Sequence, residues 1–487
     1  MKILLASSEV YPYAKVGGLA DVVGSLPFAL SKLSHDVRVV MPKYKEVEDK
    51  IVGLKKVDDL LKIHMGNTGI MEAKMYEGKM SQEVPIYFIG NNQYFYRDQI
   101  YGTKDGDYPD NAHRFTLFSR AVLMMLKKLE WFPDVIHCND FHTALVPVLL
   151  KTEFKDDPLY NRIATIFTIH NLAYQGIFSH DLLDEVGLDK NLYSIDKMEY
   201  WGKLNFMKGG MIFSEKINTV SPTYSKEIIT PEYGNGLDGV LKTREKDLFG
   251  IINGIDYAQW NPETDRSIKK RYSNKNLKGK IKCKKNLLIE QGLKSSRLSI
   301  KAPLIGIISR LADQKGLDLV EKAMEKIINL GANLIILGTG DVHYHKIFEK
   351  MSYKFKENLK VNLRFDSKLA HKIYAGCDMF LMPSRFEPCG LGQMISLKYG
   401  TIPIVRKTGG LADTVIDCDK HIEKGTGFVF KEASSKDMLS AIKRAIDVFK
   451  DKKKWNRIVR RAMGQDFSWN KSANKYVKLY NKAILSK

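Results

Sequence analysis

The chain begins with the apolar run Lys2-Ile3-Leu4-Leu5-Ala6-Ser7, and after a short interval continues with Lys15-Val16-Gly17-Gly18-Leu19-Ala20-Asp21. The first run has the length of a buried strand, and the second opens a helix that we expect to continue to Leu33. Two glycines at a helix start let backbone N–H groups approach an anion, and the positive helix end attracts phosphate. A turn that needs left-handed glycine is the alternative.

The alternation of short apolar runs with longer amphipathic stretches continues along the chain and occurs twice. This pattern is typical of βαβ units, so we predict an α/β fold with two doubly wound, Rossmann-like domains. Strand candidates in the first half are residues 2–7, 36–41, 84–89, 134–138, 163–169 and 216–220. Those in the second half are residues 303–309, 332–337, 360–364, 378–382, 402–405 and 427–430.

The length favours two domains, because 487 residues exceed what one hydrophobic core normally supports. The hydrophobic content of 44% and charged content of 27% are those of an ordinary globular protein. A polar, lysine-rich stretch follows the turn-like Asn253-Gly254-Ile255-Asp256. We therefore predict an amino-terminal domain at residues 1–248 and a carboxyl-terminal domain at 249–468, with an active-site cleft between them.

The formal net charge of +21 suggests a polyanionic partner, because basic surfaces attract nucleic acids and membranes. Thirteen Lys and Arg residues and a single acid, Glu290, lie between Arg266 and Lys301, so much of the excess is local. No recognisable nucleic-acid motif surrounds these residues. We therefore interpret segment 266–301 as a solvated face and expect no nucleic acid partner.

The cysteines are odd in number and form no Cys-x-x-Cys pair. They are Cys138, Cys283, Cys377, Cys389 and Cys418. Such a set is typical of reduced thiols in a cytosolic protein. The apolar start turns polar at Ser7, too early for a signal peptide, and no apolar run reaches the length of a membrane span. We expect a soluble, cytoplasmic protein with no membrane partner.

A second glycine-led helix start follows the strand candidate 378–382. It reads Pro383-Ser384-Arg385-Phe386-Glu387-Pro388-Cys389-Gly390-Leu391-Gly392, with a helix expected from Gln393 to Tyr399. Open α/β sheets bind their ligands at this carboxyl end of the strands. Glu387 is therefore a candidate site residue, and an N-terminal helix cap is its alternative role.

A cationic segment, Ser309-Arg310-Leu311-Ala312-Asp313-Gln314-Lys315-Gly316, follows the first strand candidate of the second half. Arg310 can make a bidentate contact to a phosphate, and Lys315 can place a second positive charge beside it. Cations where a leaving diphosphate gains charge stabilise the transition state without proton transfer. Two solvated surface charges are the alternative, which the neighbouring glycine loop makes weaker.

Seven segments, in order along the chain, resemble the bacterial glycogen synthases and plant starch synthases that use ADP-glucose. They are residues 15–21, 137–142, 168–176, 253–256, 309–316, 383–391 and 408–415. The resemblance covers nearly the whole chain and implies the two-Rossmann-domain architecture known as GT-B, with helix 469–487 returning to the first domain. It also implies retaining transfer of glucose from ADP-glucose to the non-reducing end of an α-1,4-glucan (glycogen), with release of ADP.

The resemblance also implies roles for cationic and glycine positions. Lys15 is similar to the lysine that contacts the ADP-glucose phosphates, with the N–H groups of Gly17 and Gly18 nearby. Arg310 and Lys315 resemble the pair that neutralises the departing ADP.

Glu387 resembles the acid beside the donor glucose, and His170 the residue near the reacting carbon. Residues similar to those that close around the sugar and diphosphate are Cys389, Gly390 and Leu391. Residues similar to polar positions that line the same cleft are Asp21, Asp140, Asn171 and Asn253. Gly392 departs from the pattern, because many relatives have a hydroxyl residue there. One of the rings of Tyr94, Phe95 and Tyr96 is expected near the nucleotide or acceptor.

A metal site is the alternative for His137, Asp140 and His142, but a strand-end cluster that lines a polar cleft needs no ion. Asp105-Gly106-Asp107 and Asp417-Cys418-Asp419 have the Asp-x-Asp pattern with which other glycosyltransferases hold a metal. Neither lies with the phosphate segments, so we predict a metal-independent reaction without a cofactor.

Two other functions compete with this prediction. A GT-B transferase could use a UDP- or GDP-sugar or a small acceptor, although the segment around Lys15 belongs to the ADP-glucose synthases. A non-catalytic glucan-binding protein would have no need of Arg310, Lys315 and Glu387 together. Retention could arise by attack on the face from which ADP departs or through a covalent intermediate, and the absence of an obvious second carboxylate favours the first route.

Overall fold

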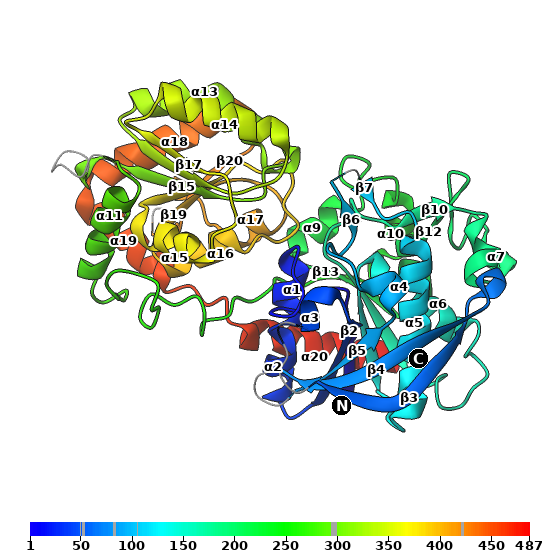
Figure 1. Cartoon of the computed structure of the whole chain (residues 1–487). Coiled ribbons are helices and arrows are strands. Elements are labelled where there is room, and N and C mark those ends of the chain that lie inside the picture. The colour runs from blue at the N-terminus through cyan, green and yellow to red at the C-terminus, as the bar shows by residue number, and fades with distance from the viewer. Residues whose placement is uncertain (49, 51–53, 81–83, 105, 294–299, 420–422) are drawn as a thin grey trace. The chain divides into compact units, whose positions relative to one another are not determined.

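The computed structural model describes residues 1–48, 50, 54–80, 84–104, 106–293, 300–419 and 423–487 (Figure 1). The chain divides into two compact units: unit 1 comprises Met1–Gly254 and Trp469–Lys487, and unit 2 comprises Ile255–Ser468. Unit 1 extends beyond residue 248, the end expected for the first domain, because β14 (Leu248–Gly250) still pairs with a strand of its sheet. Among the described residues, no helix has the length and apolar character to cross a membrane.

Unit 1 contains a nine-stranded sheet in the order β14-β13-β9-β8-β1-β2-β5-β4-β3. The strands are parallel except for β3 and β4 at one edge. Their bounds are β1 Lys2–Ala6, β2 Asp36–Pro42, β3 Lys55–His64, β4 Ile70–Lys79, β5 Pro85–Gly90, β8 Val135–Asn139, β9 Ala164–Ile169, β13 Lys216–Thr219 and β14 Leu248–Gly250. The connection order reverses between β1 and β8, the position where doubly wound sheets bind ligands.

Unit 2 contains a six-stranded parallel sheet in the order β17-β16-β15-β18-β19-β20. Its strands are β15 Leu304–Ile308, β16 Asn333–Leu337, β17 Leu359–Asn362, β18 Met379–Met382, β19 Ile402–Arg406 and β20 Phe428–Phe430. Here the order reverses between β15 and β18. Each unit therefore has a doubly wound sheet with one switch point, and the predicted fold class is confirmed.

The twelve predicted strands all coincide with observed strands, and their ends differ by a residue or two. The strands that the sequence pattern missed are short or belong to the antiparallel end of the first sheet. They are β3, β4, β14, β6 (Gly102–Thr103), β7 (Gly106–Asp107) and the small sheet of β10 (Ile177–Ser179), β12 (Lys203–Asn205) and β11 (Glu199–Tyr200). The strand β4, next to the edge strand β3, has few buried residues, so its apolar signal is weak.

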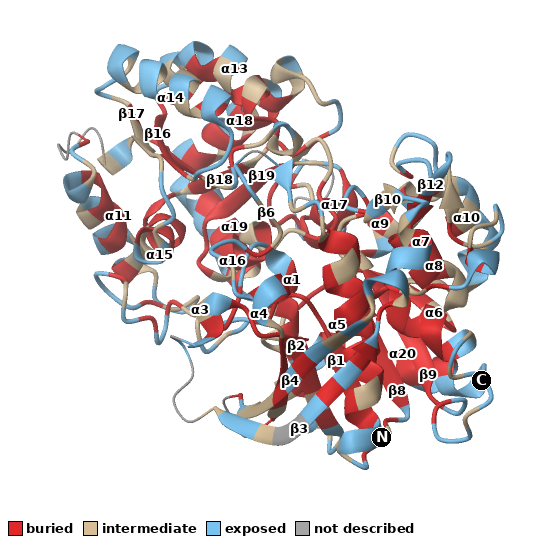
Figure 2. Ribbon diagram, turned by 45° about the vertical axis from the view of Figure 1, so that its right-hand side comes forward, coloured by how far each residue is buried: buried red, intermediate tan, exposed pale blue. Residues whose placement is uncertain are grey.

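The helices of unit 1 are α1 Gly18–Val23, α2 Leu26–Ser31, α3 Lys45–Glu48, α4 Asn92–Phe95, α5 Asn111–Lys128, α6 Leu145–Lys151, α7 Leu182–Val186, α8 Phe206–Phe213, α9 Pro222–Glu227, α10 Asp238–Thr243 and α20 Trp469–Leu485. Those of unit 2 are α11 Lys278–Glu290, α13 Leu317–Asn329, α14 Val342–Lys354, α15 Ser367–Gly376, α16 Gly392–Lys398, α17 Gly409–Thr414, α18 Ser435–Lys450 and α19 Lys452–Met463. Buried residues follow the sheets and the inner helix faces (Figure 2).

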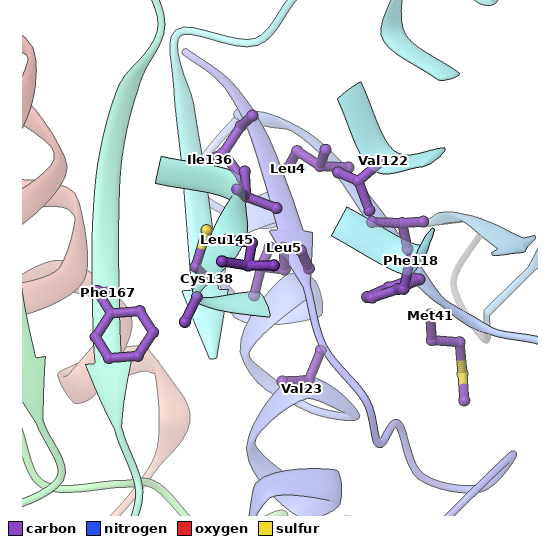
Figure 3. Packing of buried hydrophobic residues seen from close by; sticks show 14 of the residues in the cluster. Leu4, Leu5, Val23, Met41, Phe118, Val122, Ile136, Cys138, Leu145 and Phe167 are labelled. Carbon is purple, nitrogen blue, oxygen red and sulfur yellow. The ribbon is translucent and has the colours of Figure 1, made fainter. Parts of the chain in front are cut away.

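The core of unit 1 fixes the strands from which the candidate site extends. Leu4 and Leu5 of β1 lie close to Ile136 and Cys138 of β8, and Phe118 of α5 packs nearby (Figure 3). All of these side chains are fully buried. Close packing on both faces holds the ends of the central strands in place.

The predicted single helix from Gly18 to Leu33 is wrong, because the structure divides it into α1 and α2. Pro27 lies in the first turn of α2 and has no backbone N–H to continue a helix from α1. The glycine-led start is consequently a short helix with its own termini.

The basic segment 266–301 is only in part the solvated face that we expected. Lys280 of α11 is half-buried, and its ammonium donates to Thr401 Oγ1 at 2.7 Å and to the carbonyls of Tyr399 and Ala375. Burial lowers the pKa of Lys280 to about 8. Lys284 forms a 2.6 Å ion pair with Asp378. These lysines anchor α11 to its neighbours within unit 2. Residues 294–299 of the segment lie outside the described residues.

Candidate active site

The predicted site residues gather at the carboxyl ends of the strands beside each switch point. In unit 1, β1 leads to the loop with Lys15, β8 leads to Asp140, and β9 leads to His170. In unit 2, β15 leads to the segment that contains Arg310 and Lys315, and β18 leads to Glu387. Each unit thus presents one set of candidate residues where open α/β sheets bind ligands.

Lys15 and Asp21 form an ion pair in the loop that precedes and opens α1. The ammonium of Lys15 lies 2.6 and 2.8 Å from the two carboxylate oxygens of Asp21, and 5.4 Å from the ring centre of Tyr11. Burial raises the pKa of Asp21, and the positive charge of Lys15 opposes that rise. The Lys15 side chain is 37% exposed, so it can exchange this partner for an anionic ligand.

The N–H group of Gly17, which we assigned to the diphosphate, is engaged by a side chain of the chain itself. Glu9 Oε2 accepts hydrogen bonds from Val16 N at 2.6 Å and from Gly17 N at 2.8 Å. Gly17 is the N-cap of α1 and Gly18 its first residue, and both are exposed. Sequence reasoning missed Glu9, although an acid directly after the first strand was visible.

His170 follows β9 and is held as a neutral imidazole. The side-chain amide of Asn139 donates to the carbonyls of Ala6 and His137, which turns its oxygen toward His170 Nε2 at 2.9 Å. His170 Nε2 therefore carries the proton, and Nδ1 is left with a lone pair. Burial lowers the pKa of His170 to about 3, so the ring stays uncharged near neutral pH.

Asp140 follows β8 in a left-handed backbone conformation, with φ of 54°. Its Oδ1 accepts a 2.7 Å hydrogen bond from the backbone N–H of His170, which links the ends of β8 and β9. Burial raises the pKa of Asp140 to about 7, although the N–H groups of His170 and Asn171 lower it in part. Asn171 itself accepts a bond from Ala173 N at 3.1 Å.

Asn253 lies near the end of Met1–Gly254, the first of the two chain segments that form unit 1, and is 5% exposed. Its side-chain oxygen is buried and accepts no hydrogen bond from the described residues. A buried acceptor without a partner costs free energy, which a hydroxyl or amine of a ligand would recover.

In unit 2 the structure brings Lys315 and Glu387 together. The Lys315 ammonium lies 2.7 and 2.9 Å from the two Glu387 carboxylate oxygens, and Ser384 Oγ donates to the same carboxylate at 2.8 Å. The Glu387 side chain is only 8% exposed. Arg310 is exposed, just after β15. An N-cap role for Glu387 does not apply, because Leu391 is the N-cap residue of α16.

Glycines allow the loops around Glu387 to approach closely. A Cβ on Gly316 would lie 2.2 Å from Pro383 O, and one on Gly410 would lie 2.0 Å from Cys389 O. Gly410 N donates to the carbonyls of Glu387 and Pro388, both at 3.1 Å. The 309–316 and 408–410 segments therefore hold the Glu387 loop from two sides.

The loop continues into α16 through Cys389, Gly390 and Leu391. Cys389 is buried, and Gly390 has φ of 73°, a conformation that favours glycine. The Gln393 amide donates to the carbonyls of Cys389 and Gly390 at 3.0 and 2.9 Å. Gln393, a residue of α16, thereby holds the backbone of this second glycine-led start in place.

The aromatic segment near residue 95 has one exposed ring. Tyr94 and Phe95 are buried, whereas Tyr96 is 46% exposed. Sequence reasoning missed Tyr101, whose hydroxyl donates to Glu9 Oε1 at 2.7 Å and whose ring stacks on His142 at 4.6 Å. Tyr101 lacks a distinguishing motif in the sequence.

In the part of the chain that the structure describes, no group of three or more His, Cys, Asp or Glu side chains is arranged to hold a metal ion. Both ring nitrogens of His137 are engaged, by Tyr480 and Thr168. Asp417 and Asp419 pair with Arg444. Asp105 lies outside the described residues.

Comparisons with known proteins agree over the whole chain. Residues 2–243 match the family described as starch synthase catalytic domain, and residues 290–462 match glycosyl transferases group 1. The glycogen synthase of Geotalea daltonii is 47% identical over 100% of both chains, and that of Thermosipho melanesiensis is 50% identical over 99% of both.

Solved structures give the same result. The catalytic domain of starch synthase IV from Arabidopsis thaliana, bound to ADP and acarbose, superposes with a TM-score of 0.91 at 38% identity and covers 99% of both chains. Sucrose-phosphate synthase from Thermosynechococcus elongatus shares the fold, with a TM-score of 0.63 at 16% identity. With seven ordered motifs, two doubly wound units and full-length relatives in agreement, the chain belongs to the glycogen synthase and starch synthase family of GT-B glycosyltransferases.

Proposed function

We propose that this chain is a glycogen synthase, which transfers glucose from ADP-glucose to the non-reducing end of an α-1,4-glucan with retention and releases ADP. Full-length relatives that are glycogen synthases support the reaction, and the ADP and acarbose bound to the Arabidopsis enzyme support a nucleotide donor and a glucan-like acceptor. The observation that carries the proposal within this chain is the ion pair of Lys315 with the buried Glu387 at the switch point of unit 2.

Unit 2 supplies the charges for departure of ADP in this proposal. Lys315 and Arg310 neutralise the diphosphate as it gains charge, and Glu387 lies beside the donor glucose, together with Cys389, Gly390 and Leu391. Because Lys315 contacts both oxygens of Glu387, its position is set before the donor binds. Such preorganised charges lower the barrier without rearrangement at the moment of reaction.

Unit 1 contributes donor contacts and polar groups around the reacting sugar. Lys15 contacts the phosphates, after it exchanges Asp21 for the ligand. Neutral His170 lies by the anomeric carbon, where an uncharged ring does not oppose an oxocarbenium-like state. Asp140, Asn171 and Asn253 are the remaining polar contacts. That both sets of residues meet in one cleft stays a prediction, as does the cytoplasmic location.

The test is incubation with glycogen and radiolabelled ADP-glucose or UDP-glucose in parallel, with label counted in polymer. We expect incorporation mainly from ADP-glucose. Incorporation mainly from UDP-glucose would support the alternative donor. Glycogen binding without incorporation from either donor would identify a non-catalytic glucan-binding protein and reject the proposal.

A further inference from the structure

We propose that Glu9 is a positioning residue for donor binding, which holds the loop from Lys15 to Gly18 in place. The inference rests on the proposed function for its link to the donor, and on the geometry of the loop for the rest. Glu9 belongs to none of the groups that we assign to contact with the substrates. It acts through the backbone of Val16 and Gly17.

The carboxylate of Glu9 is the partner of two consecutive backbone N–H groups. Oε2 accepts from Val16 N at 2.6 Å and from Gly17 N at 2.8 Å, and the residue is 4% exposed. Burial raises the pKa of Glu9, whereas the N–H groups of Gly17 and Val16 lower it. Hydrogen bonds to a buried carboxylate are short and strong, so the loop has a firm attachment at this point.

The loop has little other restraint at these two residues. The Val16 side chain is 57% exposed, and a Cβ built on Gly17 would have no described heavy atom within 4 Å. Apolar packing therefore does not fix the path of the backbone here. Lys15 lies between Ala14, whose backbone bonds that of Val10 in both directions, and Val16, so the position of its ammonium depends in part on the two bonds to Glu9.

The other oxygen of Glu9 is fixed by a chain of hydroxyl groups. Tyr101 donates to Oε1 at 2.7 Å, so the 2.8 Å contact between Ser8 Oγ and the Tyr101 hydroxyl is a bond donated by Ser8. The Tyr101 carbonyl in turn accepts from the Asn111 side chain at 2.9 Å. Glu9 thus ties the Lys15 loop to the segment around Tyr101 and to the end of β1.

The experiment compares Glu9→Ala, Glu9→Gln and Tyr101→Phe with Glu215→Gln as a matched control. Glu215 is also buried in unit 1 and also accepts from a backbone N–H, that of Thr165 at 2.7 Å, but it lies at the opposite ends of the strands. Two quantities are measured: KM and kcat with ADP-glucose and glycogen, and hydrogen exchange of the Val16 and Gly17 amides.

We expect Glu9→Ala to raise KM for ADP-glucose about tenfold with kcat within about threefold, because a displaced cation weakens ground-state binding. Glu9→Gln, which keeps one acceptor oxygen, and Tyr101→Phe should have smaller effects in the same direction. Exchange at Val16 and Gly17 should accelerate in Glu9→Ala and stay unchanged in Glu215→Gln, even if the control lowers Tm.

Unchanged exchange at these amides in Glu9→Ala would overturn the proposal, and so would a KM shift that Glu215→Gln reproduces. If Glu9→Ala does not fold, Glu9→Gln and Tyr101→Phe are judged by the same two measurements. If the wild-type chain transfers glucose from neither ADP-glucose nor UDP-glucose, the proposed function fails, and hydrogen exchange alone then decides whether Glu9 holds the loop.

Discussion

The two glycine-led helix starts of the chain differ in how their charged residues are held. At the first, Lys15 pairs with Asp21 near the surface, with side chains 37% and 26% exposed. At the second, Lys315 pairs with Glu387 in a more buried setting, with side chains 19% and 8% exposed. The two sequences were similar as predicted phosphate-binding helix starts. In the structure, however, the Lys15–Asp21 ion pair can separate easily, whereas the Lys315–Glu387 ion pair cannot.

This difference agrees with separate tasks for the two starts. An exposed pair contributes little to stability, about 0–1 kcal/mol, so Lys15 can change partners when a ligand arrives. Glu387 is buried, so its pair with Lys315 costs more to break, up to the roughly 3–5 kcal/mol of a fully buried pair, and the two residues keep their geometry. We therefore expect changes at the second start to affect turnover and changes at the first to affect donor affinity.

Loss of Glu387 should have the largest effect. We expect Glu387→Ala to lower kcat by about 100- to 1000-fold with little change in KM, because a preorganised group at the reacting centre is lost. Lys315→Ala should cost a similar factor, and the double variant should cost much less than the product of the two. Steady-state kinetics with ADP-glucose provides the measurement. Near-normal turnover in Glu387→Ala would refute its catalytic assignment.

The next largest effect is expected from a bulkier side chain at Gly410, which packs against the loop of the second helix start. Gly410→Ala would place a Cβ 2.0 Å from Cys389 O and push the Glu387 loop out of position. We expect a fall in kcat of about 100-fold, since small displacements of a reacting group carry such costs. Gly239→Ala is the control, because its Cβ would meet no described atom within 4 Å in α10. Equal effects in the two variants would show that the loop tolerates displacement.

Removal of Lys15 at the first helix start, and of Arg310 in the segment that packs against the second, tests the separate roles of the two starts. Lys15→Ala should raise KM for ADP-glucose about tenfold and leave kcat within a few-fold, whereas Arg310→Ala should mainly lower kcat. Lys354→Ala, which removes another exposed ion pair, should change neither constant. If Lys15→Ala lowered kcat without changing KM, the proposal that the first helix start acts in donor binding and the second in turnover would be contradicted.

The last expected effect is on stability rather than on catalytic constants, at Asp140. Its pKa is raised to about 7 in the folded chain, so the folded state binds more protons than the unfolded state between about pH 4 and 7, and stability falls as pH rises through that range. Asp140→Asn removes this loss and keeps an oxygen for the His170 N–H. Relative to wild type, the variant should gain roughly 2–4 kcal/mol between pH 4 and pH 8.

Calorimetric unfolding of both proteins across this pH range provides the measurement. Glu215→Asn cannot serve as a control variant. Burial raises the pKa of Glu215, but Lys151 and Thr165 lower it, and the pKa is lowered overall. The unfolding curve of the wild-type protein is therefore the reference. A difference in Tm that does not change with pH would contradict the raised pKa of Asp140.

Much of the fold could be predicted because strands buried on both faces are continuous apolar runs. Most of the twelve predicted strands have this signal, and the carboxyl ends of β1, β9, β15 and β18 lead to Lys15, His170, Arg310 and Glu387. The antiparallel strands β3 and β4 were missed because half-exposed strands with many lysines have weak apolar alternation. The break between α1 and α2 was overlooked although Pro27 was present in the sequence.

The partners of the site residues could not be predicted in the same way. Glu9 and Tyr101 are far apart in the chain, and their hydrogen bond exists only because the fold brings β1 and the residue 101 segment together. Likewise, Lys315 and Glu387 were assigned separate roles, and their contact depends on the packing of Gly316 against Pro383. Motifs identify chemistry-bearing residues, whereas tertiary structure determines their pairs.

The return of α20 to unit 1 affects how the protein is made. Buried Tyr480 and Tyr476 of this helix bond His137 and Asn218 in the first sheet, and Ser472 donates to Ile252 O. During translation, all of unit 2 emerges before the last element of unit 1 leaves the ribosome. A nascent chain that stops at Ser468 would therefore release unit 2 whole and unit 1 with His137 Nδ1 and the Ile252 carbonyl deprived of these partners, so truncations at the carboxyl terminus should damage the half of the protein that is synthesised first.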